Sequence, residues 1–281
     1  MGYRFKLIGY PIKHSLSPWI HEQFLKKSNL KGMYSIFEIS PEKSFEESVK
    51  YLKREETDGF NVTVPYKQAI IPFLDEIDDT ARNMGAVNTV VKKNNRWIGY
   101  NTDGMGYLRS LENKYPEFVQ NKNIRILLIG AGGAARAIYF ALNHSGFTAI
   151  DIANRTPGSA REISELASSS CKSNILSLGE AEKCIDQYDL IIQTTSVGMK
   201  PHVNEAILSL DRLTSDTIVS DIVYQPLQTK FLQQAQDRGA MLHYGHTMLL
   251  YQAQYAFEIW TDRQLSINDL DVKLKAVLEG R

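Results

Sequence analysis

A pair of hydroxyl side chains stands where a predicted strand gives way to a predicted helix. Ser15 and Ser17 flank a leucine directly before Pro18, the start of an amphipathic run. Serine followed by proline is typical of a helix N-cap and first helical position, so capping accounts for Ser17. Capping leaves Ser15 and His14 without a role.

A second polar stretch is NVTVPYK, residues 61–67. Asn61 and Thr63 alternate with valines at the end of a predicted strand, so both side chains are expected on one face. We expect Pro65 to open a helix with Lys67 in its first turn, at the positive end of the helix dipole. That position is unfavourable for a purely structural charge. For a lone lysine, a solvated surface position would still be the ordinary interpretation.

Further polar groups stand at comparable places. Asn88 follows Gly-Ala-Val, and Asn101-Thr102-Asp103 precedes Gly104. An open α/β sheet binds its ligand at such element ends, although each residue alone could belong to a turn. No group of histidine, cysteine and carboxylate residues has metal-ligand spacing, so we expect no metal.

A glycine-rich segment, Gly130-Ala131-Gly132-Gly133-Ala134-Ala135, fits G-x-G-x-x-A between a predicted strand and a predicted helix. The first glycine allows a tight turn, the second lets a pyrophosphate approach, and the third small residue lets helix and strand pack closely. Dinucleotide binding is favoured over plain packing in this context. A methyltransferase with a related glycine turn is the rival interpretation.

The end of the next strand bears on the cofactor. NAD enzymes usually place Asp or Glu there to accept from the ribose 2′-hydroxyl. This chain has Asn154-Arg155-Thr156, while Asp151 comes three residues early, inside the predicted strand. A guanidinium can grip a 2′-phosphate bidentately, so the sequence favours NADP over NAD.

Alternating strands and helices must position these groups. Apolar patterning predicts strands followed by proline-initiated helices, then a hairpin turning at Asn94-Asn95. The strands are 5–12, 32–39 and 59–64, the helices begin at Pro18, Pro41 and Pro65, and the hairpin is 87–101. This order predicts an α/β fold with a mostly parallel sheet.

The pattern restarts after residue 103. A helix over 104–114 leads to a strand, glycine turn and helix over 124–146, and a long apolar helix covers 247–260. Further strands are predicted at 147–156, 188–195 and 216–224. We therefore predict two α/β domains, residues 1–103 plus 246–281, and residues 104–245.

Composition narrows the class of protein. The 281 residues include 32 basic and 32 acidic side chains, so no net field favours nucleic acid or an anionic membrane. Cys171 and Cys184 are expected to be free thiols, with a disulfide the alternative. The N-terminus lacks a signal-peptide pattern, and no segment is apolar enough to span a membrane. A cytoplasmic location is expected.

Taken together, these motifs resemble the shikimate dehydrogenase family, in order from about residue 5 to residue 262. The blocks are SLS, NVTVPYK, GAVNT, NTDG, GAGGAARA, NRT, TTSVGM, DIVYQPLQTKFL and MLLYQAQYAFEIW. The resemblance implies NADPH-dependent reduction of 3-dehydroshikimate to shikimate, toward chorismate and aromatic amino acids. It also implies that the first domain with the C-terminal helices binds substrate and that a Rossmann-like middle domain binds NADP.

The resemblance also implies roles for individual residues. Ser15 and Ser17 would hold the substrate carboxylate with help from Tyr224, and Lys67 would act as acid and base with Asp103 paired to it. His14 is the alternative acid. The residues predicted to bind substrate are Ser15, Ser17, Asn61, Thr63, Lys67, Asn88, Asp103, Tyr224 and Gln252. Those predicted to bind cofactor are Gly130, Ala131, Gly132, Gly133, Ala134, Asn154, Arg155, Thr156, Ser159, Thr195, Ile222 and Gly245.

Two alternatives remain open at this point. Ser159 stands where many NADP-using members carry a second arginine, and Arg161 follows in the next turn. An NAD-dependent quinate/shikimate dehydrogenase is therefore one alternative, and a non-catalytic NADP-binding regulator on the same fold is the other. We expect a monomer or homodimer.

Overall fold

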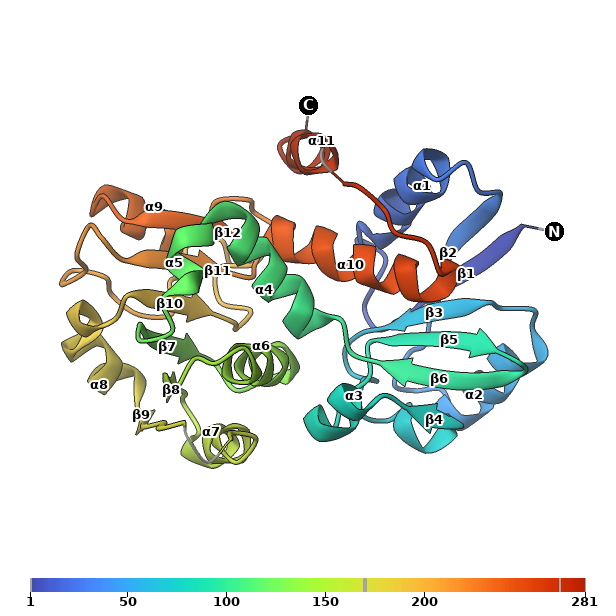
Figure 1. The fold of residues 1–281 in the computed structure, drawn as a ribbon, viewed down its shortest axis with the longest axis horizontal. Helices are drawn as coiled ribbons and strands as arrows, with labels where there is room; N and C mark the ends of the chain where they lie inside the picture. The colour runs from blue at the N-terminus through green and yellow to red at the C-terminus, as the bar shows by residue number, and fades with distance from the viewer. Residues whose placement is uncertain (1, 169–170, 268, 281) are drawn as a thin grey trace. The chain divides into compact units, whose positions relative to one another are not determined.

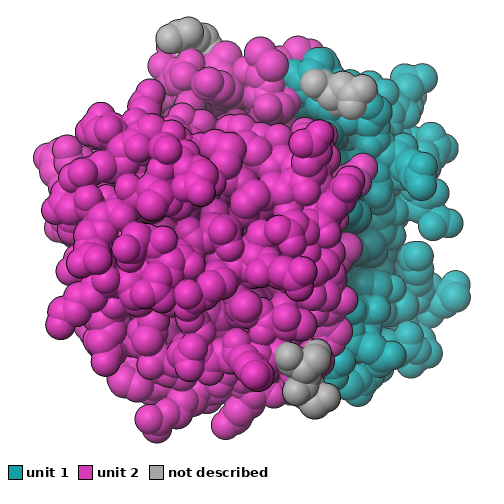
Figure 2. All heavy atoms as spheres, turned by 60° about the vertical axis from the view of Figure 1, so that its left-hand side comes forward, with its two compact units in different colours: residues 1–102, 252–270 teal, residues 103–251, 271–281 magenta. Residues whose placement is uncertain are grey.

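The chain folds into two compact units, each built around a six-stranded sheet (Figure 1). The structure is a computed structural model that describes residues 2–168, 171–267 and 269–280. Unit 1 comprises residues 1–102 and 252–270, and unit 2 comprises residues 103–251 and 271–281 (Figure 2). Helix α10 (Gly245–Thr261) is shared, because its residues join unit 1 from Gln252 onward.

The sheet of unit 1 is mixed. Its order is β2-β1-β3-β5-β6-β4, with β1 parallel to β2 and β3, and β5 antiparallel to β3 and β6. Asn94 and Asn95 turn the β5–β6 hairpin with φ of 51° and 61°, as predicted. The strands are β1 (Tyr3–Gly9), β2 (Gly32–Glu38), β3 (Gly59–Val62), β4 (Glu76–Ile77), β5 (Thr89–Lys93) and β6 (Arg96–Tyr100).

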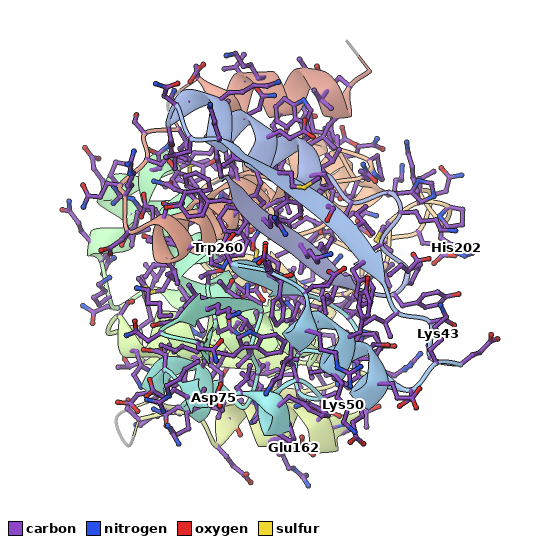
Figure 3. The ribbon with its side chains drawn as sticks, turned by 90° about the vertical axis from the view of Figure 1, so that its right-hand side faces the viewer. Lys43, Lys50, Asp75, Glu162, His202 and Trp260 are labelled. Carbon is purple, nitrogen blue, oxygen red and sulfur yellow. The ribbon has the colours of Figure 1, made fainter. Side chains whose placement is uncertain are left out.

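Helices cover both faces of this sheet. Ile8, Val62 and Val90 pack in one apolar cluster with Val49 and Leu52 of α2 (Phe45–Arg54), and α3 (Asp79–Met84) adds Ala81 to it. On α1 (Ser17–Lys27), Phe24 contacts Phe257 of α10. Trp260 of α10, labelled in Figure 3, stacks on Phe5 and donates from its indole N–H to the Val90 carbonyl at 2.9 Å. These contacts tie α10 to α1, β1 and β5.

The sheet of unit 2 is parallel throughout, in the order β12-β11-β10-β7-β8-β9. Counted along the chain within the unit, this is the doubly wound 3-2-1-4-5-6 order of dinucleotide-binding folds. The predicted α/β class with a Rossmann-like unit is confirmed. The strands are β7 (Arg125–Ile129), β8 (Ala149–Ala153), β9 (Ile175–Leu176), β10 (Leu190–Gln193), β11 (Ile218–Asp221) and β12 (Met241–Tyr244).

Successive residues on these strands pack alternately into two apolar clusters. Ile126, Leu128 and Ile152 pack with residues of α4, α5, α6 and α7, whereas Leu127 and Ile129 pack with residues of α8 and α9. The helices are α4 (Asp103–Lys114), α5 (Pro116–Gln120), α6 (Gly133–His144), α7 (Pro157–Ser164), α8 (Leu178–Lys183), α9 (Lys230–Asp237) and α11 (Leu270–Leu278).

The predicted helix starting at Pro65 is wrong. The chain makes turns there, followed by a short 3₁₀ helix over Ile71–Phe73. The Lys67 carbonyl accepts a hydrogen bond from the Val87 N–H at 2.8 Å. Pro72 has no backbone N–H and so could not donate a hydrogen bond within a continuing helix. Lys67 therefore does not lie at a helix N-terminus, and its predicted position at the positive end of a helix dipole is wrong as well.

Two predicted helix starts also shift. Helix α2 begins at Phe45 with Ser44 as its N-cap, whose hydroxyl accepts from the Glu47 N–H, so Pro41 lies before the helix. Leu16 is the N-cap of α1, with no side-chain cap bond, so the prediction that Ser17 caps this helix is wrong.

Candidate active site

The serine pair is built as a small hydrogen-bonded turn ahead of α1. Ser15 Oγ accepts from the Ser17 N–H at 3.2 Å and donates to Ser17 Oγ at 3.2 Å. Ser15, rather than Ser17, therefore satisfies a backbone group at the helix start. Ser17 is 7% exposed and Ser15 is partly exposed. The turn brings both hydroxyls together, whereas His14 is exposed.

Asn61 and Asn88 meet between neighbouring strands. The Asn61 amide donates to the Asn88 carbonyl at 3.2 Å, and the Val62 N–H donates to the same carbonyl at 2.8 Å. Asn88 Oδ1 accepts from the Thr102 N–H at 2.8 Å, which anchors the residue directly before Asp103. Asp103 is itself buried at the start of α4.

Thr63 and Lys67 follow β3 on the same connection. The Thr63 N–H donates to the Ile8 carbonyl at 2.9 Å, and the Lys67 carbonyl accepts from Val87, next to Asn88. Both side chains are half-buried. The backbone of the lysine is thus held beside the Asn88 strand end by a contact far away in sequence.

The glycine-rich turn between β7 and α6 leaves room for a ligand. Gly130 has φ of +108°, and a Cβ there would lie 2.6 Å from Thr194 Oγ1, so a side chain is excluded. A Cβ on Gly132 or Gly133 would meet nothing within 4 Å. Helix α6 begins at Gly133. The open space at the N-terminus of this helix fits a pyrophosphate, which the helix N–H groups can bind.

The end of β8 lacks a carboxylate that could bind a ribose 2′-hydroxyl. Asp151 is buried, accepting from the Asn174 N–H at 2.8 Å and from the Tyr188 hydroxyl at 2.9 Å. Arg155 and Thr156 are exposed, and the Asn154 amide holds the turn through the Thr156 carbonyl at 2.9 Å. The donors present here suit a phosphate, and Ser159 lies on the first turn of the following helix α7.

Sequence reasoning missed a buried clamp at the ends of β10 and β11. Gln193 Nε2 donates to the carbonyls of Thr195 and Val197 at 3.2 and 3.1 Å and to Asp221 Oδ1 at 3.2 Å. Gln193 Oε1 accepts from the Thr195 N–H. Burial raises the pKa of Asp221 to about 7, against hydrogen bonds from Thr229 and the Val223 N–H. Two polar residues ending adjacent predicted strands were the signal for this clamp.

The remaining predicted residues lie in unit 2 or on helix α10, which the two units share. The Ile222 N–H donates to the Gln193 carbonyl at 3.1 Å, and a Cβ on Gly245 would lie 2.3 Å from the Ile222 carbonyl oxygen. Tyr224 is half-buried, and burial raises the pKa of its phenol. Gln252 lies on α10, half-buried.

Comparison with known proteins decides the family. Family models match at residues 7–90 ("Shikimate dehydrogenase substrate binding domain"), 113–222 ("Shikimate / quinate 5-dehydrogenase") and 245–268 ("Shikimate 5'-dehydrogenase C-terminal domain"). A curated shikimate dehydrogenase (NADP(+)) of Oceanobacillus iheyensis is 55% identical over 281 residues, the full length of both chains. The chain belongs to the shikimate dehydrogenase family.

Solved structures of shikimate dehydrogenases agree in fold over nearly the whole chain. One, in complex with NADP⁺, has a TM-score of 0.89 and 34% identity, covering 99% of this chain and 95% of that one. The Thermus thermophilus enzyme, in complex with NADP(H) and shikimate, has a TM-score of 0.85 and 30% identity over 98% and 99% of the two chains. A Corynebacterium glutamicum quinate dehydrogenase in complex with NAD has a TM-score of 0.88 at 26% identity, over 100% and 99%.

The described residues also lack two kinds of feature. They contain no group of three or more histidine, cysteine and carboxylate residues placed to hold a metal ion. None of their helices combines the length and apolar character needed to cross a bilayer. Cys171 and Cys184 are both free thiols.

Proposed function

We propose that this chain catalyses the reversible NADP-dependent reduction of 3-dehydroshikimate to shikimate, a step toward chorismate and aromatic amino acids. The observation that carries the proposal is full-length similarity, at 55% identity, to a shikimate dehydrogenase (NADP(+)). The doubly wound unit and its roomy glycine turn support the cofactor assignment. Residues 1–103 and 246–281 are proposed to bind substrate, and residues 104–245 to bind NADP.

In the proposed mechanism, NADPH supplies a hydride to the carbonyl carbon when it is bound. Lys67 donates a proton from its ammonium group to the carbonyl oxygen and stabilises the negative charge that develops there. Asp103 acts with Lys67 and orients the substrate hydroxyl. In the reverse direction Lys67 accepts the proton. The backbone bonds at Val87 and Thr102 support these roles, because they hold the chain on either side of Asn88.

Substrate orientation is assigned to groups that match the chemistry of shikimate. Ser15 and Ser17 hold the carboxylate from their turn ahead of α1, with Tyr224 as a further donor. The ring hydroxyls both donate and accept, which suits amide, hydroxyl, ammonium and carboxylate partners. The proposed ring contacts are Asn61, Thr63, Lys67, Asn88, Asp103 and Gln252.

Cofactor binding is assigned to the described loops of unit 2. Gly130, Ala131, Gly132, Gly133 and Ala134 form the pyrophosphate turn. Asn154, Arg155, Thr156 and Ser159 lie at the end of β8 and the start of α7, where Arg155 would bind the 2′-phosphate. Thr195, Ile222 and Gly245 complete the set. A cytoplasmic location and a monomer or homodimer complete the proposal.

The alternatives are distinguished by one assay. Purified protein is mixed with shikimate or quinate and with NADP⁺ or NAD⁺, and the nicotinamide absorbance is followed. We expect turnover with shikimate and NADP⁺. Turnover only with quinate and NAD⁺ would favour the catabolic alternative, and cofactor binding without any turnover would favour the regulator.

A further inference from the structure

A continuous run of buried hydrogen bonds crosses the sheet of unit 1 next to the proposed substrate residues. The Tyr34 hydroxyl donates to Asn61 Oδ1 at 2.8 Å, and Asn61 Nδ2 donates to Thr89 Oγ1 at 3.1 Å. The Thr89 hydroxyl donates to Asn88 Oδ1 at 2.9 Å. Asn88 Nδ2 donates to Thr102 Oγ1 at 3.0 Å. All of these side chains are buried, and Thr89 is 0% exposed.

Backbone groups fix the orientation of both side-chain amides in this network. Asn61 Nδ2 also lies 3.2 Å from the Asn88 carbonyl, which only accepts, so that atom of Asn61 must be nitrogen. Asn88 Oδ1 lies 2.8 Å from the Thr102 N–H, which only donates, so that atom must be oxygen. Thr89 Oγ1 accepts from Asn61 Nδ2 and lies 2.9 Å from Asn88 Oδ1 and 3.4 Å from Thr102 Oγ1, so the contact with Asn88 is the shorter one for its single proton.

The Asn88 amide is therefore restricted in what it can offer a ligand. Its oxygen already accepts from the Thr102 N–H and from the Thr89 hydroxyl, with the Thr102 hydroxyl a further donor at 3.3 Å, so both lone pairs are used. Any further bond from this amide must be donated by Nδ2. The ligand atom facing it must be an acceptor, such as a hydroxyl or alkoxide oxygen.

Both amide hydrogens and one oxygen lone pair of Asn61 are engaged within the protein. Both of its amide hydrogens are donated, to the Asn88 carbonyl and to Thr89, and its oxygen accepts from Tyr34. Tyr34 is held in place by the His21 ring, which stacks on it at 4.4 Å between centroids and 4° between planes. Burial raises the pKa of the Tyr34 phenol, so it remains a proton donor.

We propose that Thr89, backed by Tyr34 and Asn61, is a positioning residue that locks the Asn88 amide as a hydrogen-bond donor to a substrate oxygen. The proposal rests on the proposed function, which places Asn88 in the substrate site. It also gives Asn61 a second role, which acts through Thr89 and Asn88.

The central variant is Thr89→Val, which keeps the shape and removes the hydroxyl. We expect a rise in the KM and Kd for shikimate of roughly tenfold, with a smaller change in kcat and an unchanged Kd for NADP⁺. Thr89→Ser restores a hydroxyl and should bind shikimate almost as wild type does. The matched control is Thr57→Val, because Thr57 Oγ1 is buried and has no hydrogen-bond partner among the described residues. It should leave shikimate binding unchanged.

A double-mutant cycle separates positioning from a general structural role. In an Asn88→Ala background, Thr89→Val should add little to the loss of shikimate affinity. A full additional loss there would overturn the proposal, as would a Thr89→Val protein that matches Thr57→Val. If Thr89→Val does not fold, Tyr34→Phe takes its place, with Tyr66→Phe as control, since the Tyr66 hydroxyl bonds to the Ile39 carbonyl instead of to this network. Tyr34→Phe should then raise the KM for shikimate roughly threefold, and no difference between the two variants would refute the network's role.

A readout without substrate keeps this test separate from that of the proposed function. The side-chain amide signals of Asn88, followed by NMR in the free protein, should shift in Thr89→Val and stay in place in Thr57→Val. Unmoved signals would overturn the positioning role whatever the enzyme's substrate. Absence of turnover by wild type with shikimate and NADP⁺ would instead overturn the proposed function and leave the amide result to decide the network.

Discussion

Replacing Asp221 by asparagine is expected to change how the stability of the protein depends on pH. Asp221 is fully buried at the end of β11. Its Oδ1 accepts from the Val223 N–H at 2.9 Å and from Gln193 Nε2 at 3.2 Å, and its Oδ2 accepts from the Thr229 hydroxyl at 2.6 Å. These bonds favour the carboxylate, but burial outweighs them and raises the pKa from 3.8 to about 7.

The direction of the effect follows from proton linkage. Between the unfolded and folded pKa values, the folded protein holds a proton that the unfolded chain has released. The free energy of unfolding therefore falls as the pH rises through this window, and it levels off above the folded pKa of about 7. The slope reaches about 1.4 kcal/mol per pH unit, so Asp221 should lower stability by about 2 kcal/mol between about pH 5 and pH 7.

Asp221→Asn mimics the protonated acid and cannot ionise. Its amide oxygen can accept from Val223 and Gln193, and its NH₂ can donate to the Thr229 oxygen. The difference in unfolding free energy, wild type minus Asp221→Asn, should thus fall by about 2 kcal/mol over that pH range. Urea unfolding should be followed by far-UV circular dichroism, which reports on both units. Tryptophan fluorescence would report on unit 1 alone, because Trp19, Trp97 and Trp260 all lie there, whereas Asp221 lies in unit 2.

Asp237→Asn, at the exposed end of α9, is the control and should keep the pH dependence of wild type. Parallel stability curves for wild type and Asp221→Asn from pH 5 to pH 7 would refute the reasoning, because they would mean that Asp221 ionises alike in the folded and unfolded chains.

Further variants test the two proposed binding regions. Arg155→Ala should raise the KM for NADP⁺ by about tenfold or more and that for NAD⁺ far less, because a charge-assisted contact to the 2′-phosphate is worth about 1.5–3 kcal/mol; equal losses with both cofactors would contradict the assignment. Ser15→Ala should weaken shikimate binding in calorimetry, leave NADP⁺ binding intact, and cost about 0.5–1.5 kcal/mol in urea unfolding through the lost bond to the Ser17 N–H. Gly130→Ala should lower stability by more than about 1 kcal/mol and weaken NADP⁺ binding, since its φ of +108° and the nearby Thr194 hydroxyl exclude a methyl group. A stable Gly130→Ala protein with normal NADP⁺ affinity would show that the turn tolerates a side chain.

The parts of the fold that could be predicted from sequence are those specified by local patterns. Apolar strands and amphipathic helices appear where their periodicity places them, and Asn94-Asn95 adopts the positive φ values that its hairpin needs. The glycine turn also follows from a local requirement, the positive φ of Gly130. Such signals need only a few neighbouring residues.

The segment after β3 could not be predicted in this way, because distant groups determine it. Pro65 is compatible with a helix start. The Lys67 carbonyl, however, accepts from the Val87 N–H, and the Asp75 carboxylate accepts from the Trp97 N–H. No periodic pattern in the sequence predicts these contacts. The same holds for Asn61, whose type suggests a ligand contact while its partners Tyr34, Asn88 and Thr89 come from elsewhere in the sheet.

The measurement that tests the account most directly is steady-state kinetics of Lys67→Ala with shikimate and NADP⁺. If Lys67 moves the proton at the reacting oxygen, kcat should fall by about 10²–10⁴-fold. KM should change by only a few-fold, because the lost interaction is made mainly in the transition state. Asp103→Ala should also be severe, and the double variant should be little worse than the worse single one. A Lys67→Ala enzyme with kcat close to wild type would contradict the account and make His14 the candidate proton donor.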